Sequence, residues 1–212
     1  MMKRIRIFGT VLAIAIAFLC SCKESKEIGE YDNWKERNEE FIENIASLCQ
    51  NYITQGITPQ NAKKGDMFRL LSYKLDPAKE WGVSSYIYCQ VLDDKRTGSV
   101  SPLSTDSVLI NYRLRLMPTE KYPNGQIADQ SFKTAQLDPA VNIPASFQIS
   151  ELVTGVTTAL TNMMEGDTWR IYVPTGLGYG INERTNIPRY SALVFEINLV
   201  SFARTGASLP PK

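Results

Sequence analysis

The chain of 212 residues is long enough for one substantial core and a smaller appendage. Its 23 basic and 22 acidic side chains nearly cancel and form no basic stripe, which argues against a nucleic-acid partner. The chain has no histidine, and its four cysteines show no paired C-x-x-C spacing, so imidazole-dependent triads are excluded and a metal centre is disfavoured. We therefore expect neither a metal nor another cofactor.

The N-terminus has the pattern of an export signal. Three basic residues precede the apolar run IFGTVLAIAIAFL, which is too short to span a bilayer and is typical of a signal-peptide core. The run closes in LCSC, which resembles a bacterial lipobox whose last cysteine is lipid-modified. Residues 1–22 are thus predicted to be a lipoprotein signal peptide, with Cys22 as the lipidation site that anchors the chain to a membrane. An ordinary secretory signal cleaved nearby is the alternative.

Two further features bear on the compartment. Lys23 follows the candidate lipidated cysteine, whereas inner-membrane retention signals of enteric bacteria typically begin with Asp, so the outer membrane of a bacterial cell envelope is favoured. Removal of the leader leaves Cys49 and Cys89. The pair is compatible with a disulfide in an oxidising envelope and equally with two buried free thiols.

Residues 23–84 are predicted to be a tether followed by an N-terminal helical region. The segment from Tyr31 to Gly56 is strongly helical in pattern, with Asp32 as a candidate N-cap and Gly56 as the end. One asparagine, Asn38, interrupts a stripe of apolar residues at seven-residue spacing, which are Trp34, Phe41, Ile45, Leu48 and Tyr52. About three heptads are marginal for a coiled coil, so we favour a helix docked on its own domain over dimerisation through this helix. Residues 56–84 are turn-rich and indicate no definite element.

From Ser85 onward the pattern favours strands. Apolar residues alternate with polar ones over 108–117, which gives one apolar face containing Tyr112 and one charged face. A long polar loop follows at 121–144. The segment from Ser150, a candidate N-cap, to Gly166, a candidate stop, is predicted to be a short helix with Leu152, Val153, Val156, Leu160 and Met163 on its inner face. The remaining strands are expected at 86–92, 145–150, 168–174 and 191–202. One short helix among non-adjacent strands indicates an α+β fold with an antiparallel sheet.

Six motifs then occur in a recognisable order. They are V-x-I-N-Y, G-x-x-x-D, P-x-x-F-x-I, a helix ending M-x-x-G-D, I-x-V-P-x-x-L-x-Y-G, and I-P followed by L-V-F-E-I-x-L. From Ser85 to Phe202 the chain resembles the FK506-binding-protein family (FKBP) of peptidyl-prolyl cis-trans isomerases. The resemblance implies a twisted antiparallel sheet wrapped around one short helix, an isomerase domain at 85–204 with a tail at 205–212, and proline-containing polypeptides as substrates.

The resemblance also assigns a site. The implied catalytic residues are Tyr112, Asp129, Tyr179 and Phe195, and the implied substrate-binding residues are Leu152, Val153, Val156 and Ile187. Tyr179 matches the tyrosine whose hydroxyl reaches the bound peptide carbonyl, with Gly178 before it where the family often has alanine. Rotation about an X-Pro amide breaks no bond, so the absence of histidine is no obstacle to this chemistry.

The chain departs from the family pattern at three positions. Ala128, Ala145 and Val156 stand where aromatic pocket walls are common. Each missing ring removes on the order of 1 kcal/mol or more of apolar contact, although Phe132 is a candidate replacement. The expected function is therefore a weak isomerase of the cell envelope that accelerates X-Pro rotation in exported proteins. The alternative is a non-catalytic module that binds peptides or proteins through the same fold.

Overall fold

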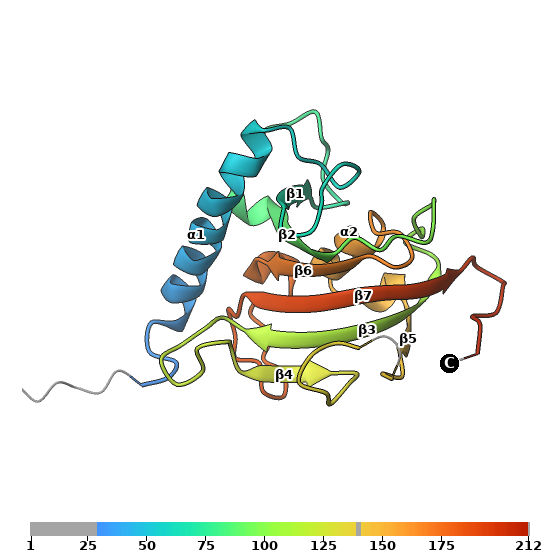
Figure 1. The fold of residues 1–212 in the computed structure, drawn as a ribbon. Helices are drawn as coiled ribbons and strands as arrows, with labels where there is room; N and C mark the ends of the chain where they lie inside the picture. Colours follow the sequence, from blue (N-terminus) through green and yellow to red (C-terminus); the bar gives the residue numbers. More distant parts are fainter. Residues whose placement is uncertain (1–28, 139–140, 212) are drawn as a thin grey trace, which may run out of the picture.

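The computed structural model describes residues 29–138 and 141–211. The expected signal peptide and Cys22 lie outside the described residues. Within them, one twisted antiparallel sheet has the strand order β1-β2-β6-β7-β3-β4, and β5 pairs with β3 beside β4 (Figure 1). The strands are β1 Met67–Leu71, β2 Tyr86–Asp93, β3 Ser107–Leu116, β4 Ile127–Gln130, β5 Ala145–Gln148, β6 Thr168–Val173 and β7 Leu193–Ala203. The helices are α1 Trp34–Thr54 and α2 Thr154–Leu160, with 3₁₀ turns at Val83–Ser85, Ile149–Glu151 and Thr175–Leu177.

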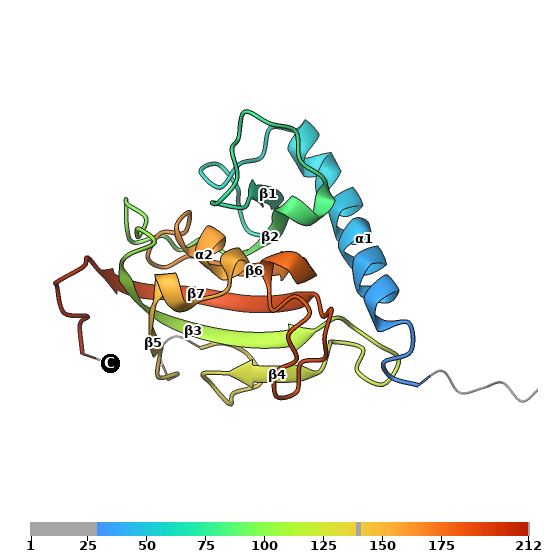
Figure 2. The same ribbon diagram turned by 180° about the vertical axis from the view of Figure 1, so that it is seen from behind.

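Strand alternation divides the core between the two helices. Phe68 and Ile87 belong to the main apolar cluster beneath α2. Their neighbours Met67 and Tyr88 point to the other face and join the cluster beneath α1. The two helices therefore cover opposite faces of the sheet, and Figure 2 shows α2 on the near face with α1 at one end. The expected α+β fold is confirmed.

The N-terminal helix packs against its own sheet, as favoured from the sequence. Its buried residues are Trp34, Asn38, Ile42, Ile45 and Cys49, whereas Leu48, expected in the apolar stripe, is 59% exposed. Asn38 is no interruption of the packing. Its Oδ1 accepts a hydrogen bond from the Ala192 N–H at 2.7 Å, and its Nδ2 donates to the Trp34 carbonyl at 2.6 Å. The Trp34 indole N–H donates to Ser191 Oγ at 2.9 Å. α1 is thus tied to the segment that leads into β7.

Three expected helix boundaries were wrong or incomplete. Asp32 does not cap α1, because its carboxylate accepts a hydrogen bond from the Gly29 N–H and Asn33 holds the N-cap position. Ser150 does not cap α2 either, since a 3₁₀ turn intervenes and Val153 is the N-cap. α2 ends at Leu160, six residues before Gly166. Gly56, with a φ of 72°, follows the end of α1 as expected.

Two strands were missed in segments rich in turn residues. β1 lies in the stretch for which no element was expected, and β4 lies in the expected loop 121–144. The face of β3 that was expected to be charged is covered. Arg113 is 4% exposed, and its guanidinium donates to Gln130 Oε1 and to the carbonyls of Thr134 and Ala135. That guanidinium also stacks 4.4 Å from the centroid of the Phe132 ring.

The two cysteines inside the described chain are free and buried. Burial raises the pKa of the Cys49 thiol to about 11 and raises that of Cys89 well above its usual value. Both groups are therefore neutral core residues at physiological pH. Within the described residues, no helix combines the length and apolar character needed to cross a membrane.

The domain boundary predicted at Ser85 lies between β1 and β2. Because these two strands pair with each other, a boundary there would divide one sheet. We expect a fragment of residues 85–204 to unfold at a lower denaturant concentration than residues 29–204, or to aggregate. The fragment exposes the edge of β2 and loses Phe68, which stacks edge-on against Trp169 with centroids 4.9 Å apart. Phe68→Ala in the longer chain measures the contribution of this ring alone and should lower the free energy of unfolding by about 3–5 kcal/mol. Equal unfolding midpoints for the two fragments would support the boundary at Ser85.

Candidate active site

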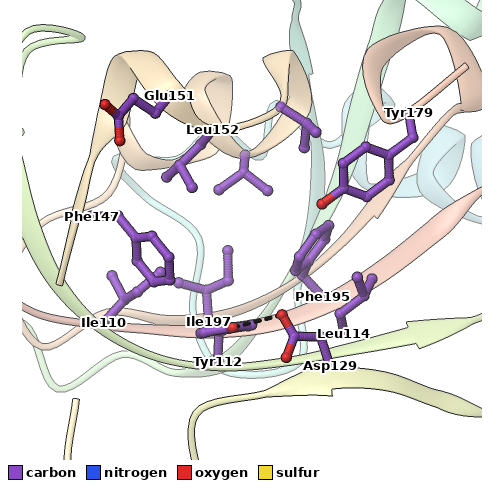
Figure 3. Close-up of a pocket in the computed structure, with 12 residues that line it drawn as sticks. Ile110, Tyr112, Leu114, Asp129, Phe147, Glu151, Leu152, Tyr179, Phe195 and Ile197 are labelled. Carbon is purple, nitrogen blue, oxygen red and sulfur yellow. Dashed lines mark hydrogen bonds between the residues drawn. The ribbon is translucent and has the colours of Figure 1, made fainter. Parts of the chain in front are cut away.

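An apolar pocket opens between α2 and the sheet (Figure 3). Its volume is about 130 Å³. Its lining comes from four strands, the entry to α2 and the turn after β6, and comprises Ile110, Tyr112, Leu114, Asp129, Phe147, Glu151, Leu152, Val153, Val156, Tyr179, Phe195 and Ile197. Seven of the eight residues assigned from the sequence are thus brought together in one place.

The floor follows from the registers of three strands. Tyr112 lies opposite Ile197, and Leu114 lies opposite Phe195, so alternate residues of β3 and β7 face α2. Phe147 on β5 meets the Tyr112 ring edge-on, with centroids 5.6 Å apart and planes at 72°. Phe147 was not assigned from the sequence, although the period-two pattern places it on the same face as Ala145.

One polar pair occupies the wall beside β4. A register shift between Leu114 and Arg115 places Asp129 opposite Leu114, and the Tyr112 hydroxyl donates to Asp129 Oδ2 at 2.8 Å. Burial, followed by this hydrogen bond, raises the pKa of Tyr112 above its usual range. The Tyr112 hydroxyl is therefore neutral and already engaged with an acceptor.

Tyr179 is held on a turn that needs its glycines. A Cβ on Gly178 would lie 2.9 Å from Leu193 Cδ1, and Gly180 has a φ of 63°. The Gly180 N–H donates to the Thr175 carbonyl at 3.0 Å, which closes the turn. The Tyr179 hydroxyl points into the pocket (Figure 3) and has no hydrogen-bond partner in the part of the chain that the structure describes. Burial raises its pKa, so the group is a neutral donor.

The helix entry supplies the opposite wall and a second donor. The Leu152 N–H donates a hydrogen bond to the Ile149 carbonyl at 3.1 Å. The Val153 N–H, at the N-cap of α2, donates to no acceptor among the described residues. Val156 on α2 is 3% exposed and also lines the pocket. Two residues that line the pocket, Val153 and Tyr179, therefore carry donors without an acceptor among the described residues, and the other polar groups of the lining are Tyr112, Asp129 and Glu151.

Other assignments fall outside the lining. Ile187 is buried in the main cluster and is bridged to Arg184. Phe132 lies against Arg113 and does not replace a missing pocket ring. Ala128 packs on the main cluster. Neither Ala128 nor Ala145 lines the pocket. The described residues contain no group of three or more histidine, cysteine or acidic side chains that could hold a metal.

Comparisons with known proteins agree with this geometry. A model of the FKBP-type peptidyl-prolyl cis-trans isomerase family matches residues 98–200. The chain is 37% identical over 102 residues to the peptidyl-prolyl cis-trans isomerase Mip of Coxiella burnetii, covering 48% of this chain and 39% of that protein. It is 32% identical over 143 residues to the outer membrane protein MIP of Legionella longbeachae, covering 67% and 54% respectively.

A crystal structure of a peptidyl-prolyl cis-trans isomerase from Pseudomonas syringae pv. tomato covers 76% of this chain and 96% of its own, with 24% identity and a TM-score of 0.45. The chain spans about half the length of the curated relatives it matches. The matched segment contains β3 to β6, most of β7, α2 and every residue that lines the pocket. Residues 98–200 thus form a domain of the FKBP-type peptidyl-prolyl cis-trans isomerase family.

Proposed function

We propose that this protein is a prolyl isomerase of the bacterial cell envelope that accelerates X-Pro rotation in exported polypeptides. One observation carries the proposal. The Tyr179 hydroxyl, which has no hydrogen-bond partner among the described residues, is a neutral donor aimed into the pocket, a combination that suits an amide whose polarity changes as it twists. No general acid, base or nucleophile is needed, because no covalent bond is broken.

The chemistry follows from the resonance of the X-Pro amide. This resonance sets a rotational barrier of roughly 18–20 kcal/mol, and uncatalysed exchange takes tens of seconds or longer. A pocket that removes water from the amide favours the twisted form, which is less polar than the planar one. Contacts that strengthen only in the twisted form lower the barrier, whereas contacts equal in both forms improve binding alone.

Each pocket residue then has a role in the proposal. Phe195, Tyr112 and Phe147 line the pocket and enclose the proline ring. Tyr179 Oη and the Val153 N–H donate to backbone carbonyls of the bound peptide. Asp129 holds the Tyr112 hydroxyl, which fixes the orientation of that ring.

A second candidate is a binding module with little turnover. It is favoured by the small side chains at Ala128, Ala145 and Val156, since Phe132 faces away from the pocket and compensates for none of them. Phe147 restores one aromatic wall, which supports the isomerase reading.

We further propose that the mature chain is attached through a lipid on Cys22. The lipobox-like sequence supports this, and the Legionella longbeachae relative is named outer membrane protein MIP. The outer membrane is the proposed location. Dimerisation through α1 finds no support in its packing, because its apolar face is buried against its own sheet.

The role of Tyr179 is tested by turnover of a short X-Pro peptide, measured by NMR exchange. Tyr179→Phe should reduce kcat/KM several-fold, as expected for the loss of about 0.5–1.5 kcal/mol from one neutral hydrogen bond. Phe195→Ala should reduce both turnover and stability, because it leaves a cavity in the pocket floor. Tyr73→Phe, at an exposed tyrosine outside the pocket, is the matched control. An active wild type that is indifferent to Tyr179→Phe would refute the role of that hydroxyl.

The pH dependence follows from the tyrosines. Because burial raises the pKa of both Tyr112 and Tyr179, each stays protonated beyond the ordinary tyrosine value of about 10. With a peptide that carries no titrating group, kcat/KM should not decline from tyrosine ionisation between pH 7 and about 10. A decline within that range that disappears in Tyr179→Phe would show that its hydroxyl ionises early and contradict the neutral-donor assignment.

Lipid attachment is tested in a bacterial host by metabolic labelling with a fatty acid and by detergent partitioning. The full-length chain should incorporate label and enter the detergent phase, whereas Cys22→Ser should do neither. Equal labelling of both chains would exclude Cys22 as the site, and Cys49→Ser is the matched control.

A further inference from the structure

A second hollow lies on the other side of the Tyr179 turn. It runs between α1 and the segment 174–181 and has a volume of about 680 Å³. Figures 1 and 2 both show the chain after β6 and the 3₁₀ turn Val83–Ser85 alongside α1. We call this hollow the α1 groove. Its apolar lining includes Ile42, Val83, Pro174, Ile181 and Tyr190, and its charged lining is Lys35, Glu39 and Glu43.

The α1 groove exposes large apolar side chains from three separate segments. Ile181 is 65% exposed, Val83 is 41% exposed and Tyr190 is 37% exposed. Single exposed apolar residues are ordinary, but several gathered around one hollow mark an interaction surface. The surface is therefore suited to apolar side chains of a partner.

The groove and the active-site pocket lie on the two sides of one turn, and consecutive residues of that turn line them. Tyr179 lines the pocket, and the next two residues, Gly180 and Ile181, line the groove. An extended chain advances roughly 3.3–3.6 Å per residue. A polypeptide that crosses the turn at Tyr179 would therefore need only a few residues to reach from the pocket to the groove.

The walls of the groove are already fixed without a partner. The Tyr190 N–H donates to the Gly180 carbonyl at 2.9 Å, and Thr175 Oγ1 donates to the Tyr190 carbonyl at 2.9 Å. The hydrogen bond from Ala192 to Asn38 ties this pair of segments to α1. A partner therefore binds without ordering the loop first, which lowers the entropic cost of association.

The charges of α1 select the sign of the partner. The Lys35 ammonium lies 3.9 Å from Glu39 Oε1 in an exposed ion pair and 5.7 Å from the centroid of the Tyr190 ring. Glu43, one turn further along, forms no ion pair with the described part of the chain. The groove thus offers one unpaired carboxylate beside apolar walls, which favours a lysine or arginine with an apolar neighbour.

We propose that the α1 groove is a second subsite for the polypeptide substrate, and that it holds residues flanking the proline, with a preference for an apolar residue next to Lys or Arg. The proposal rests on the proposed isomerase function. It makes the N-terminal helix a part of the substrate-binding surface.

The test compares a short X-Pro peptide, confined to the pocket, with longer peptides extended on both sides of the proline. The extensions carry apolar residues together with either Lys or Glu. The wild type should have a higher kcat/KM for the long Lys peptide than for the short one. Ile181→Ser should reduce that ratio several-fold by removing apolar contact. Leu103→Ser, at a comparably exposed position outside both hollows, is the matched control.

The charge preference is tested with Glu43→Lys. This variant should reverse the preference between the Lys and Glu peptides, and the reversal should fade at high salt. Glu40→Lys, on the same helix but outside the groove, controls for net charge.

The outcomes are distinguishable. If Ile181→Ser lowers turnover of short and long peptides equally, the effect passes through Tyr179 and the subsite is refuted. If both groove variants handle the long peptides as the wild type does, it is also refuted. If the wild type turns over neither peptide, the isomerase function fails. In that case the affinity of the long Lys peptide for the wild type and both variants, measured by calorimetry, tests binding in the groove independently of turnover. Equal affinities would refute the subsite.

Discussion

The hydrogen bond between Asn38 Oδ1 and the Ala192 N–H links the two halves of the molecule. Both partners are buried, so the loss of either leaves an unsatisfied polar group at a cost of about 1–3 kcal/mol. The Trp34 indole reinforces it by donating to Ser191 Oγ, which in turn donates to the Pro188 carbonyl at 2.7 Å. An asparagine that weakens an apolar stripe thereby determines where α1 docks.

The docking of α1 is connected to the pocket through backbone hydrogen bonds. Tyr190 adopts a φ of 63°, and its amide and carbonyl are both bonded to the segment that carries Tyr179. The donor aimed into the pocket therefore depends on contacts from α1, which lies outside the segment that matches the family. The same contacts build one wall of the α1 groove, so pocket and groove share a single scaffold.

Much of this was predictable from local pattern, and what was missed has physical causes. Alternation of apolar and polar residues predicted β3, and the resemblance to the family assigned Tyr112 and Phe195 to the pocket. β1 and β4 are short and lie among turn residues, so their pairing with longer strands outweighs local propensity. Arg113 looked like a surface charge because the chain that covers it returns some 20 residues later with carbonyl acceptors. The partner of Asn38 is 154 positions away, beyond any window of periodicity.

The pocket and the groove contribute differently to turnover. Residues in the groove lie away from the rotating amide, so they contact the planar and the twisted substrate equally. Such uniform contacts lower KM without raising kcat. In the proposed mechanism the rate comes from Tyr179, Phe195 and the apolar walls of the pocket. Binding in the proposed groove subsite would thus offset the affinity lost with the aromatic rings missing at Ala128, Ala145 and Val156, but it would not restore the rate. The two proposed functions then differ only in the rate of turnover, and the side chains of the pocket walls determine that rate.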